Sequence, residues 1–213
     1  MPNSLQKRKE IFAVINRTLK KLYPEISIAL QYANDWQLLV AVILSAQTTD
    51  KKVNQITAPL FAQYPDVKDF ARLSPEKLAQ LIHGVNYHNT KARNIIADAH
   101  ILLDCYGGKI PDTMEELTQL RGVARKTANI LLSHIYGKRE GIAVDTHVKR
   151  LTKLLGLTIY TDPEKIEKDL MQVVPPKEYQ NFSLRLIQYG RDYCSARKHN
   201  HNNCPLNVAL KKK

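Results

Sequence analysis

Apolar residues recur at helical spacing along almost the whole chain. Near the N-terminus they are separated by steps of three, four or seven, which places them on one face of a helix. These residues are Leu5, Phe12, Ile15, Leu19 and Leu22. Residues 36–44 are apolar on every side, which predicts a helix buried in the middle of a domain.

The rest of the pattern also favours helices. Residues 142–144 form the only β-rich stretch of the sequence, and it is too short to build a sheet. Ser74 and Asp162 are each followed by Pro and Glu, a combination typical of a helix start, and Asp50 and Asp112 occupy similar places. We expect about ten helices joined by short connections, hence an all-α fold.

The composition adds a strong positive charge. The 213 residues include 32 Lys and Arg against 20 Asp and Glu, a formal net charge of +12, within an otherwise ordinary globular composition. Such an excess of cations favours a polyanionic partner, with nucleic acid ahead of an acidic membrane surface.

Several other function classes find no support. The sequence contains no G-x-x-x-x-G-K-[ST], no G-x-G-x-x-G and no H-E-x-x-H. Residues 38–44, the most apolar run, are too short to cross a bilayer, and the first residues lack the apolar core of a secretory signal. Three cysteines cannot build a disulfide framework, and we expect Cys105 to be an ordinary buried thiol. We therefore expect a soluble, cytoplasmic protein without membrane contact, associated with the nucleoid if it is bacterial.

The most informative segment spans residues 117–132. The pattern predicts one apolar helix ending near Leu120, a turn at Gly122 and a second helix beginning around Ala124. Two helices joined so tightly leave backbone N–H groups pointing outward at a helix start. That arrangement binds a phosphate oxygen without reading base sequence.

The charges of this segment point the same way. Arg121, Arg125 and Lys126 crowd a helix N-terminus, where the macrodipole disfavours each cation by roughly 0.3–1 kcal/mol. A bound phosphate would make the positive charges favourable at this place. The positive field of the helix N-terminus also favours the neutral, nucleophilic form of Lys126. The alternative is a basic helix start that is simply solvated.

A carboxylate follows at Asp145. Its simplest role is the N-cap of a helix beginning at Thr146, and that role does not exclude a second one. A carboxylate held at one helix start and a lysine activated at another suit attack on a carbon that develops positive charge. Neither half of this pair is specific alone.

Together these motifs resemble the helix-hairpin-helix DNA glycosylases, in particular the endonuclease III branch. The hairpin L-x-G-V-x-R-K-T-A-N and the later A-V-D-T-H-V-x-R carry the resemblance, and residues 38–50 and 189–198 agree with it. It implies a two-lobed helical fold with DNA in the cleft between the lobes. The implied lobes are a six-helix lobe over 28–138, ending in the hairpin, and a second lobe made of 1–27 and 139–213.

The resemblance also implies an activity. The protein would be a bifunctional DNA glycosylase and AP lyase of base excision repair, which flips an oxidised pyrimidine such as thymine glycol out of duplex DNA. Lys126 would attack C1′ and form a Schiff base, Asp145 would stabilise the cationic sugar and assist proton transfer, and β-elimination would cut the strand. Adenine-specific relatives lack the hairpin lysine and do not cut, so Lys126 and Asp145 indicate the bifunctional branch.

The DNA contacts implied by the resemblance lie in three segments. Gln47 matches the residue that fills the gap left by the flipped base, although a polar residue at the exposed end of a buried helix explains it equally well. Tyr87, in a loop at 85–90 that looks longer than the common form, is a candidate wedge. The hairpin contacts are Arg121, Gly122, Val123, Ala124 and Arg125. Arg121 stands where the family usually has Pro, and Ala124 where it has a second Gly.

The C-terminal segment departs from the family. Members commonly hold a [4Fe–4S] cluster on C-x6-C-x2-C-x5-C, and here those places fall on Cys194, His201, Cys204 and Leu210. Such clusters need four protein ligands, normally thiolates, so we expect the cluster to be absent. Zinc held by Cys194, His199, His201 and Cys204 is the alternative, but this spacing matches no standard zinc motif. We expect no metal, and a loop closed by packing and hydrogen bonds.

Two other functions remain open from the sequence. One is a DNA-binding protein that kept the fold and lost catalysis, against which the retained Lys126 and Asp145 argue. The other is a glycosylase for a mismatched or alkylated base. In each case the expected partner is double-stranded DNA, and for the two enzymes this DNA is damaged. We expect the protein to be a monomer.

Overall fold

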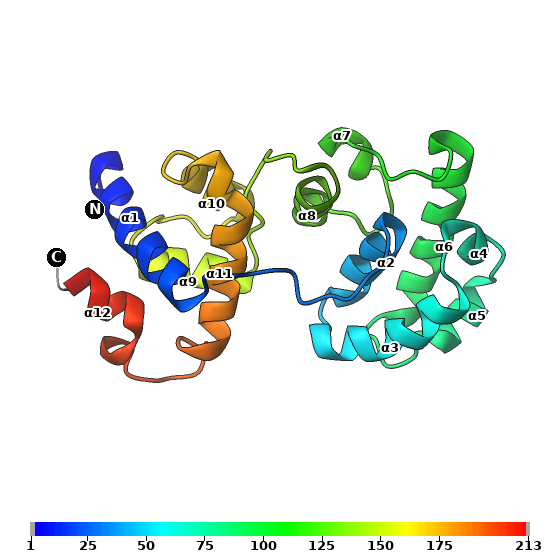
Figure 1. Cartoon of the computed structure of the whole chain (residues 1–213), viewed down its shortest axis with the longest axis horizontal. Coiled ribbons are helices and arrows are strands. Elements are labelled where there is room, and N and C mark those ends of the chain that lie inside the picture. Colours follow the sequence, from blue (N-terminus) through cyan, green and yellow to red (C-terminus); the bar gives the residue numbers. More distant parts are fainter. Residues whose placement is uncertain (1–2, 212–213) are drawn as a thin grey trace. The chain divides into compact units, whose positions relative to one another are not determined.

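The computed structural model describes residues 3–211, and within that range the chain is all helical, as the pattern predicted (Figure 1). The described residues form twelve α-helices and two 3-10 helices, without a strand. The number exceeds the expected one because several helices are only one or two turns long. No helix in this range combines the length and the apolar character needed to cross a membrane.

The chain divides into two compact units, each with its own core. One unit is continuous and runs from Ala29 to Lys138, and the other combines the chain up to Ile28 with the chain from Arg139 onward. The continuous unit contains α2 (Asp35–Ser45), α3 (Asp50–Gln63), α4 (Val67–Ala71), α5 (Pro75–Leu81), α6 (His88–Tyr106), α7 (Met114–Leu117) and α8 (Arg125–Tyr136).

Helix α2 forms the centre of the continuous unit. Every residue from Trp36 to Leu44 is buried, as its apolar sequence predicted. The helix packs against α3, α6 and α8, while α4 and α5 cover α6. The Trp36 ring meets the Phe70 ring of α4 edge to face, with centroids 5.2 Å apart.

The discontinuous unit is built around α11. It contains α1 (Leu5–Leu22), α9 (Thr146–Leu154), α10 (Pro163–Met171), the 3-10 helix η1 (Pro176–Glu178), α11 (Tyr179–Asp192), the 3-10 helix η2 (His201–Asn203) and α12 (Pro205–Lys211). Helix α11 packs against α1 and α9, and α12 packs against α1. The rings of Phe12 and Phe182 lie edge to face across the contact between α1 and α11, with centroids 5.2 Å apart.

The buried face of α1 differs from the prediction at its first turn. Leu5 was expected inside and is 45% exposed, whereas Arg8 is buried. The Arg8 guanidinium donates to the Leu157 carbonyl at 2.7 Å and pairs with Asp169 at 2.8 Å. A paired and hydrogen-bonded arginine can replace an apolar residue on such a face.

The helix starts follow the predicted chemistry with small shifts. The side chains of Ser74 and Asp162 cap α5 and α10 as expected. Helix α3 begins at Asp50 with Thr49 as its cap, and α7 is capped by Thr113, one residue beyond the expected Asp112.

The expectation that Cys105 is buried is wrong. Its side chain is exposed in the last turn of α6, just before the helix ends at Tyr106. The last buried residue of this helix is Leu102, because the neighbouring helices do not cover its final turn.

Candidate functional site

The predicted helical hairpin is present, with a shorter first helix than expected. Helix α7 ends at Leu117, and a turn carries the chain to α8. Gly122 has φ +80°, a conformation that favours glycine. A Cβ at this position would meet Nδ2 of Asn94 at 3.3 Å, so α6 closely backs the turn. Val123 is buried and anchors the turn in the core.

The start of α8 has no side-chain cap. Ala124 occupies the N-cap position with extended backbone and a methyl group that cannot accept a hydrogen bond. Helices usually satisfy these first N–H groups with a Ser, Thr, Asp or Asn at this place. Ala124 and Lys126 are exposed on either side of Arg125. The hairpin thus presents an uncapped helix N-terminus and an exposed lysine together, which suits an anion.

A buried aspartate holds the hairpin from behind. The backbone N–H of Arg121 donates to Oδ1 of Asp98 at 2.7 Å, and Asp98 is fully buried in α6. Burial raises the pKa of Asp98 to about 7 because it disfavours the charged form. A proline at position 121 would have no N–H to donate, so the bond depends on a residue other than proline there. Sequence reasoning missed Asp98, whose signal was an acidic residue on the apolar face of a helix.

Asp145 is the N-cap of α9, the structural role expected for it. Its Oδ1 accepts from the Val148 N–H at 2.8 Å, which fixes the carboxylate at the helix start. The side chain is half-buried. Asp145 belongs to the discontinuous unit, whereas Lys126 belongs to the continuous one.

Gln47 and Tyr87 share an unusual backbone conformation. Both have φ +58°, and they are the two residues other than glycine with positive φ among those described. Asn86 joins their loops: its Nδ2 donates to the Gln47 carbonyl at 2.5 Å, and its backbone N–H donates to Oγ1 of Thr48 at 3.3 Å. Tyr87 is 65% exposed. The structure therefore brings the predicted gap-filling residue and the predicted wedge loop together.

Lys91 supports the same loops from inside. Its Nζ donates to the carbonyls of Leu44 and Ala46 at 2.8 and 2.6 Å, which satisfies the end of α2 just before Gln47. Burial lowers the pKa of Lys91 to about 8. No local sequence pattern indicates this role.

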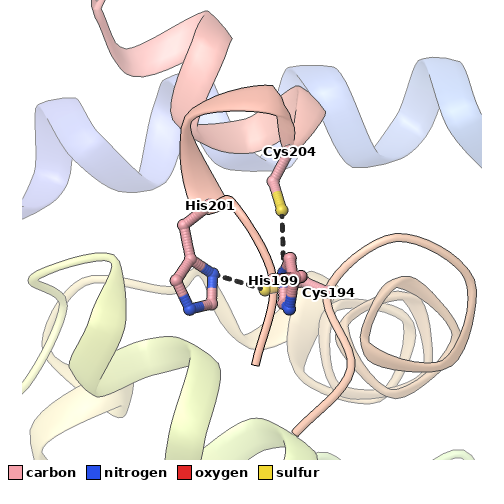
Figure 2. Close-up of side chains that lie close together, drawn as sticks. All are labelled: Cys194, His199, His201 and Cys204. Carbon is pink, nitrogen blue, oxygen red and sulfur yellow. Dashed lines mark hydrogen bonds between the residues drawn. The ribbon is translucent and has the colours of Figure 1, made fainter. Parts of the chain in front are cut away.

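Four Cys and His side chains converge near the C-terminus. Cys194, His199, His201 and Cys204 point toward one another, and one ligand atom from each lies within 4.8 Å of all the others (Figure 2). Both sulfurs are buried. Burial and the neighbouring Cys194 raise the pKa of the Cys204 thiol. Leu210, at the last family ligand place, packs against the apolar core instead.

The fold and the hairpin define a class of protein. A model of the HhH-GPD superfamily of base excision DNA repair proteins matches residues 40–176. An endonuclease III of Synechocystis sp. (strain ATCC 27184 / PCC 6803 / Kazusa) is 45% identical over 206 residues, covering 97% of this chain and 92% of that protein. An endonuclease III of Bacillus subtilis (strain 168) is 39% identical over 186 residues, covering 87% and 84%.

Solved structures agree with the sequence matches. A non-covalent endonuclease III–DNA complex superposes with a TM-score of 0.88 at 36% identity, covering 96% of this chain and 97% of that one. A trapped covalent endonuclease III–DNA intermediate gives a TM-score of 0.87 at 36% identity, covering 96% and 98%. The chain belongs to the endonuclease III family.

Proposed function

We propose that this protein is a DNA glycosylase and AP lyase of base excision repair, acting on oxidised pyrimidines in duplex DNA. The observation that carries the proposal is the exposed Lys126 in the first turn of α8, directly after an uncapped hairpin turn. Family membership supports the class of reaction. A relative forms a covalent intermediate with DNA, which requires a nucleophile, and Lys126 is the candidate for that role in this chain.

The hairpin binds the DNA backbone. Backbone N–H groups at the start of α8 donate to a phosphate oxygen, and the small exposed side chain of Ala124 leaves room for its approach. Arg121 and Arg125 add positive charge at the same place. The net charge of +12 supports binding that weakens steeply as salt rises, since counterions are released from the DNA.

The extruded nucleotide then reacts with Lys126. The neutral amine attacks C1′, the glycosidic C–N bond breaks, and the base leaves with the bonding electrons and takes up a proton. Opening of the sugar ring gives a Schiff base between Nζ and C1′. Loss of a proton from C2′ then expels the 3′ phosphate, so the strand is cut by β-elimination. Water finally releases the lysine.

Asp145 supports the charges that develop in these steps. Its carboxylate is fixed by the Val148 N–H, so it requires little reorganisation as the sugar becomes cationic. It also accepts the proton that the Lys126 nitrogen loses once the neutral amine has bonded to C1′. The N-cap bond and the catalytic role use the same carboxylate, and its removal affects both.

The loops that contain Gln47 and Tyr87 stabilise the opened duplex. Extrusion of a base costs a few kcal/mol of lost stacking and pairing, and is least costly for a damaged base. Gln47 enters the vacated space, and the exposed Tyr87 ring stacks beside the opposite strand. Asn86, which precedes Tyr87 in its loop, couples the two insertions because it donates to Gln47 and Thr48 of the other loop.

The test is a strand-cutting assay on a duplex with one thymine glycol, with an abasic duplex alongside. We expect cutting of both by the wild type, loss of both with Lys126→Gln, and a strong reduction with Asp145→Asn. Lys68→Gln, an exposed lysine of α4, removes the same charge away from the hairpin and should cut normally.

Other outcomes identify the alternatives. Cutting of the abasic duplex alone would retain the lyase and direct the search to mismatched or alkylated bases. Tight binding without cutting of either duplex would refute the enzyme and leave a DNA-binding protein.

A further inference from the structure

The Cys and His cluster is assembled by a short, internally bonded loop. Cys194 lies just after α11, and its N–H donates to the Tyr189 carbonyl at 3.1 Å. The 3-10 helix η2 then turns the chain back, with the Asn200 side chain accepting from the Asn202 N–H. Cys204 follows η2 and directly precedes α12. This turn brings together residues whose spacing, C-x4-H-x-H-x2-C, matches no common metal motif.

The donor atoms have the separations of a tetrahedral site. Sγ of Cys194 lies 3.5 Å from Nδ1 of His201, and Sγ of Cys204 lies 3.3 Å from Nε2 of His199 (Figure 2). In a tetrahedral zinc site with Zn–S about 2.3 Å and Zn–N about 2.0–2.1 Å, sulfur and nitrogen ligands lie about 3.6 Å apart. Small side-chain shifts would therefore place all four atoms around one ion.

The surroundings of the cluster orient its ligands. Nδ1 of His199 lies 2.8 Å from the Arg197 carbonyl. A proton on Nδ1 makes this hydrogen bond and leaves the Nε2 lone pair toward Cys204, the arrangement that carbonyls impose on metal-binding histidines. On the other side, Arg150 donates to both Sγ and the carbonyl of Cys194, at 3.7 and 2.5 Å. A guanidinium there would offset the negative charge of a zinc-bound sulfur.

The residues do not fit the iron–sulfur cluster common in relatives. That cluster takes four protein ligands, normally thiolates, and this loop supplies two. The fourth thiolate place is Leu210, whose side chain packs against the core. A cubane also inserts iron and sulfide atoms between its ligands, whereas these four donors already lie within 4.8 Å of one another.

We propose that Cys194, His199, His201 and Cys204 bind a single zinc ion, in place of the iron–sulfur cluster of the family. Two sulfur and two nitrogen ligands in a closed set are typical of structural zinc. Binding displaces the two thiol protons to solvent and forms two Zn–S and two Zn–N bonds. The expectation of a metal-free loop came from sequence spacing, and the converging geometry argues against it.

The ion would connect α11 to α12. Cys194 extends from the end of α11 and Cys204 from the start of α12, so one ion closes the loop between them. Because α12 packs against α1, the ion would also stabilise the packing of the N-terminal helix. The loop also contains the exposed Arg197 and Lys198, which the ion would hold in one arrangement.

The experiment measures the metal content of the full-length protein without a histidine tag. We expect one zinc per chain, no stoichiometric iron or sulfide, and no cluster absorption. After removal of zinc with a chelator, Co²⁺ should give the ligand-field spectrum of a tetrahedral site with thiolate ligands. Cys204→Ser and His199→Ala should each lower the zinc content and change that spectrum. Cys105→Ser removes an exposed thiol outside the loop and should keep both.

Three results would overturn the proposal. The first is iron and sulfide at cluster stoichiometry. The second is a protein without metal that gives no tetrahedral Co²⁺ spectrum at one equivalent. The third is loss of two thiols to a disulfide between Cys194 and Cys204 in protein kept under reducing conditions. None of these results depends on the repair reaction, so the zinc site and the proposed function fail or stand separately.

Discussion

Replacement of Asp98 by Asn should stabilise the protein at neutral and alkaline pH. Asp98 is fully buried, Oδ1 accepts the Arg121 N–H, and Oδ2 has no hydrogen-bond partner. Its folded pKa of about 7 lies well above the value of 3.8 for a solvated aspartate. The folded state therefore holds this proton more tightly than the unfolded state does, so stability is greatest below pH 4 and is lost as the pH rises to about 7.

The magnitude follows from the shift. One pKa unit corresponds to 1.36 kcal/mol, so a shift of about three units limits the effect to about 4 kcal/mol. Asn stays neutral at every pH, and its carbonyl oxygen can still accept the Arg121 N–H. We expect Asp98→Asn to match the wild type near pH 4 and to exceed it by about 2–4 kcal/mol at pH 8.

Urea unfolding at a series of pH values measures this difference. Asp104→Asn changes an exposed aspartate of the same helix and is the matched control, with an expected effect within about 0.5 kcal/mol at every pH. A difference between Asp98→Asn and the wild type that does not vary between pH 4 and pH 8 would refute the reasoning. Such a result would mean that the buried carboxyl does not titrate in this range.

Three further predictions concern the hairpin, the core and the insertion loops. Gly122→Ala should destabilise the protein by about 1–2 kcal/mol and weaken DNA binding, because φ is +80° at this position. Unfolding experiments measure the loss of stability, and fluorescence anisotropy measures the loss of DNA binding. Arg8→Ala should cost about 3 kcal/mol in unfolding experiments, since it leaves the half-buried Asp169 carboxylate without its partner. Asn86→Ala should slow excision of thymine glycol more than cutting at an abasic site, because Gln47 loses its link to the neighbouring loop.

Each of these predictions has its own control. Gly107, at the end of α6 and away from the hairpin, also has a positive φ. Gly107→Ala should therefore lower stability and leave DNA binding intact. Equal loss of binding in both glycine variants would contradict the role of the hairpin turn. Arg17→Ala, an exposed arginine of α1, should change stability little. Equal slowing of both reactions by Asn86→Ala would show that it acts on the chemical step rather than on extrusion.

Local patterns predicted the elements of the fold well. The apolar run of α2, the caps at Ser74 and Asp162 and the glycine turn at Gly122 each depend on residues close in sequence. The errors arose where tertiary packing decides. Leu5 has the right periodicity, yet Arg8 is the residue that is buried, because it bonds to partners 149 and 161 residues away.

The candidate site was predicted less completely, for a similar reason. Lys126 and Asp145 lie in recognisable motifs, but the support given by Asp98 and Lys91 involves contacts 23 to 47 residues away in sequence. The Cys and His cluster was disfavoured because its spacing is unfamiliar. The four donor atoms converge because η2 turns the chain back. This turn could not be predicted, since a short 3-10 helix has no clear sequence pattern.

Borohydride trapping with a duplex that carries one thymine glycol tests the central claim most directly. Reduction converts a Schiff base into a stable amine, and digestion followed by mass spectrometry identifies the attached residue. The account predicts an adduct on the peptide that contains Lys126, and no adduct with Lys126→Ala. An adduct on another lysine, or undiminished trapping in the variant, would contradict it.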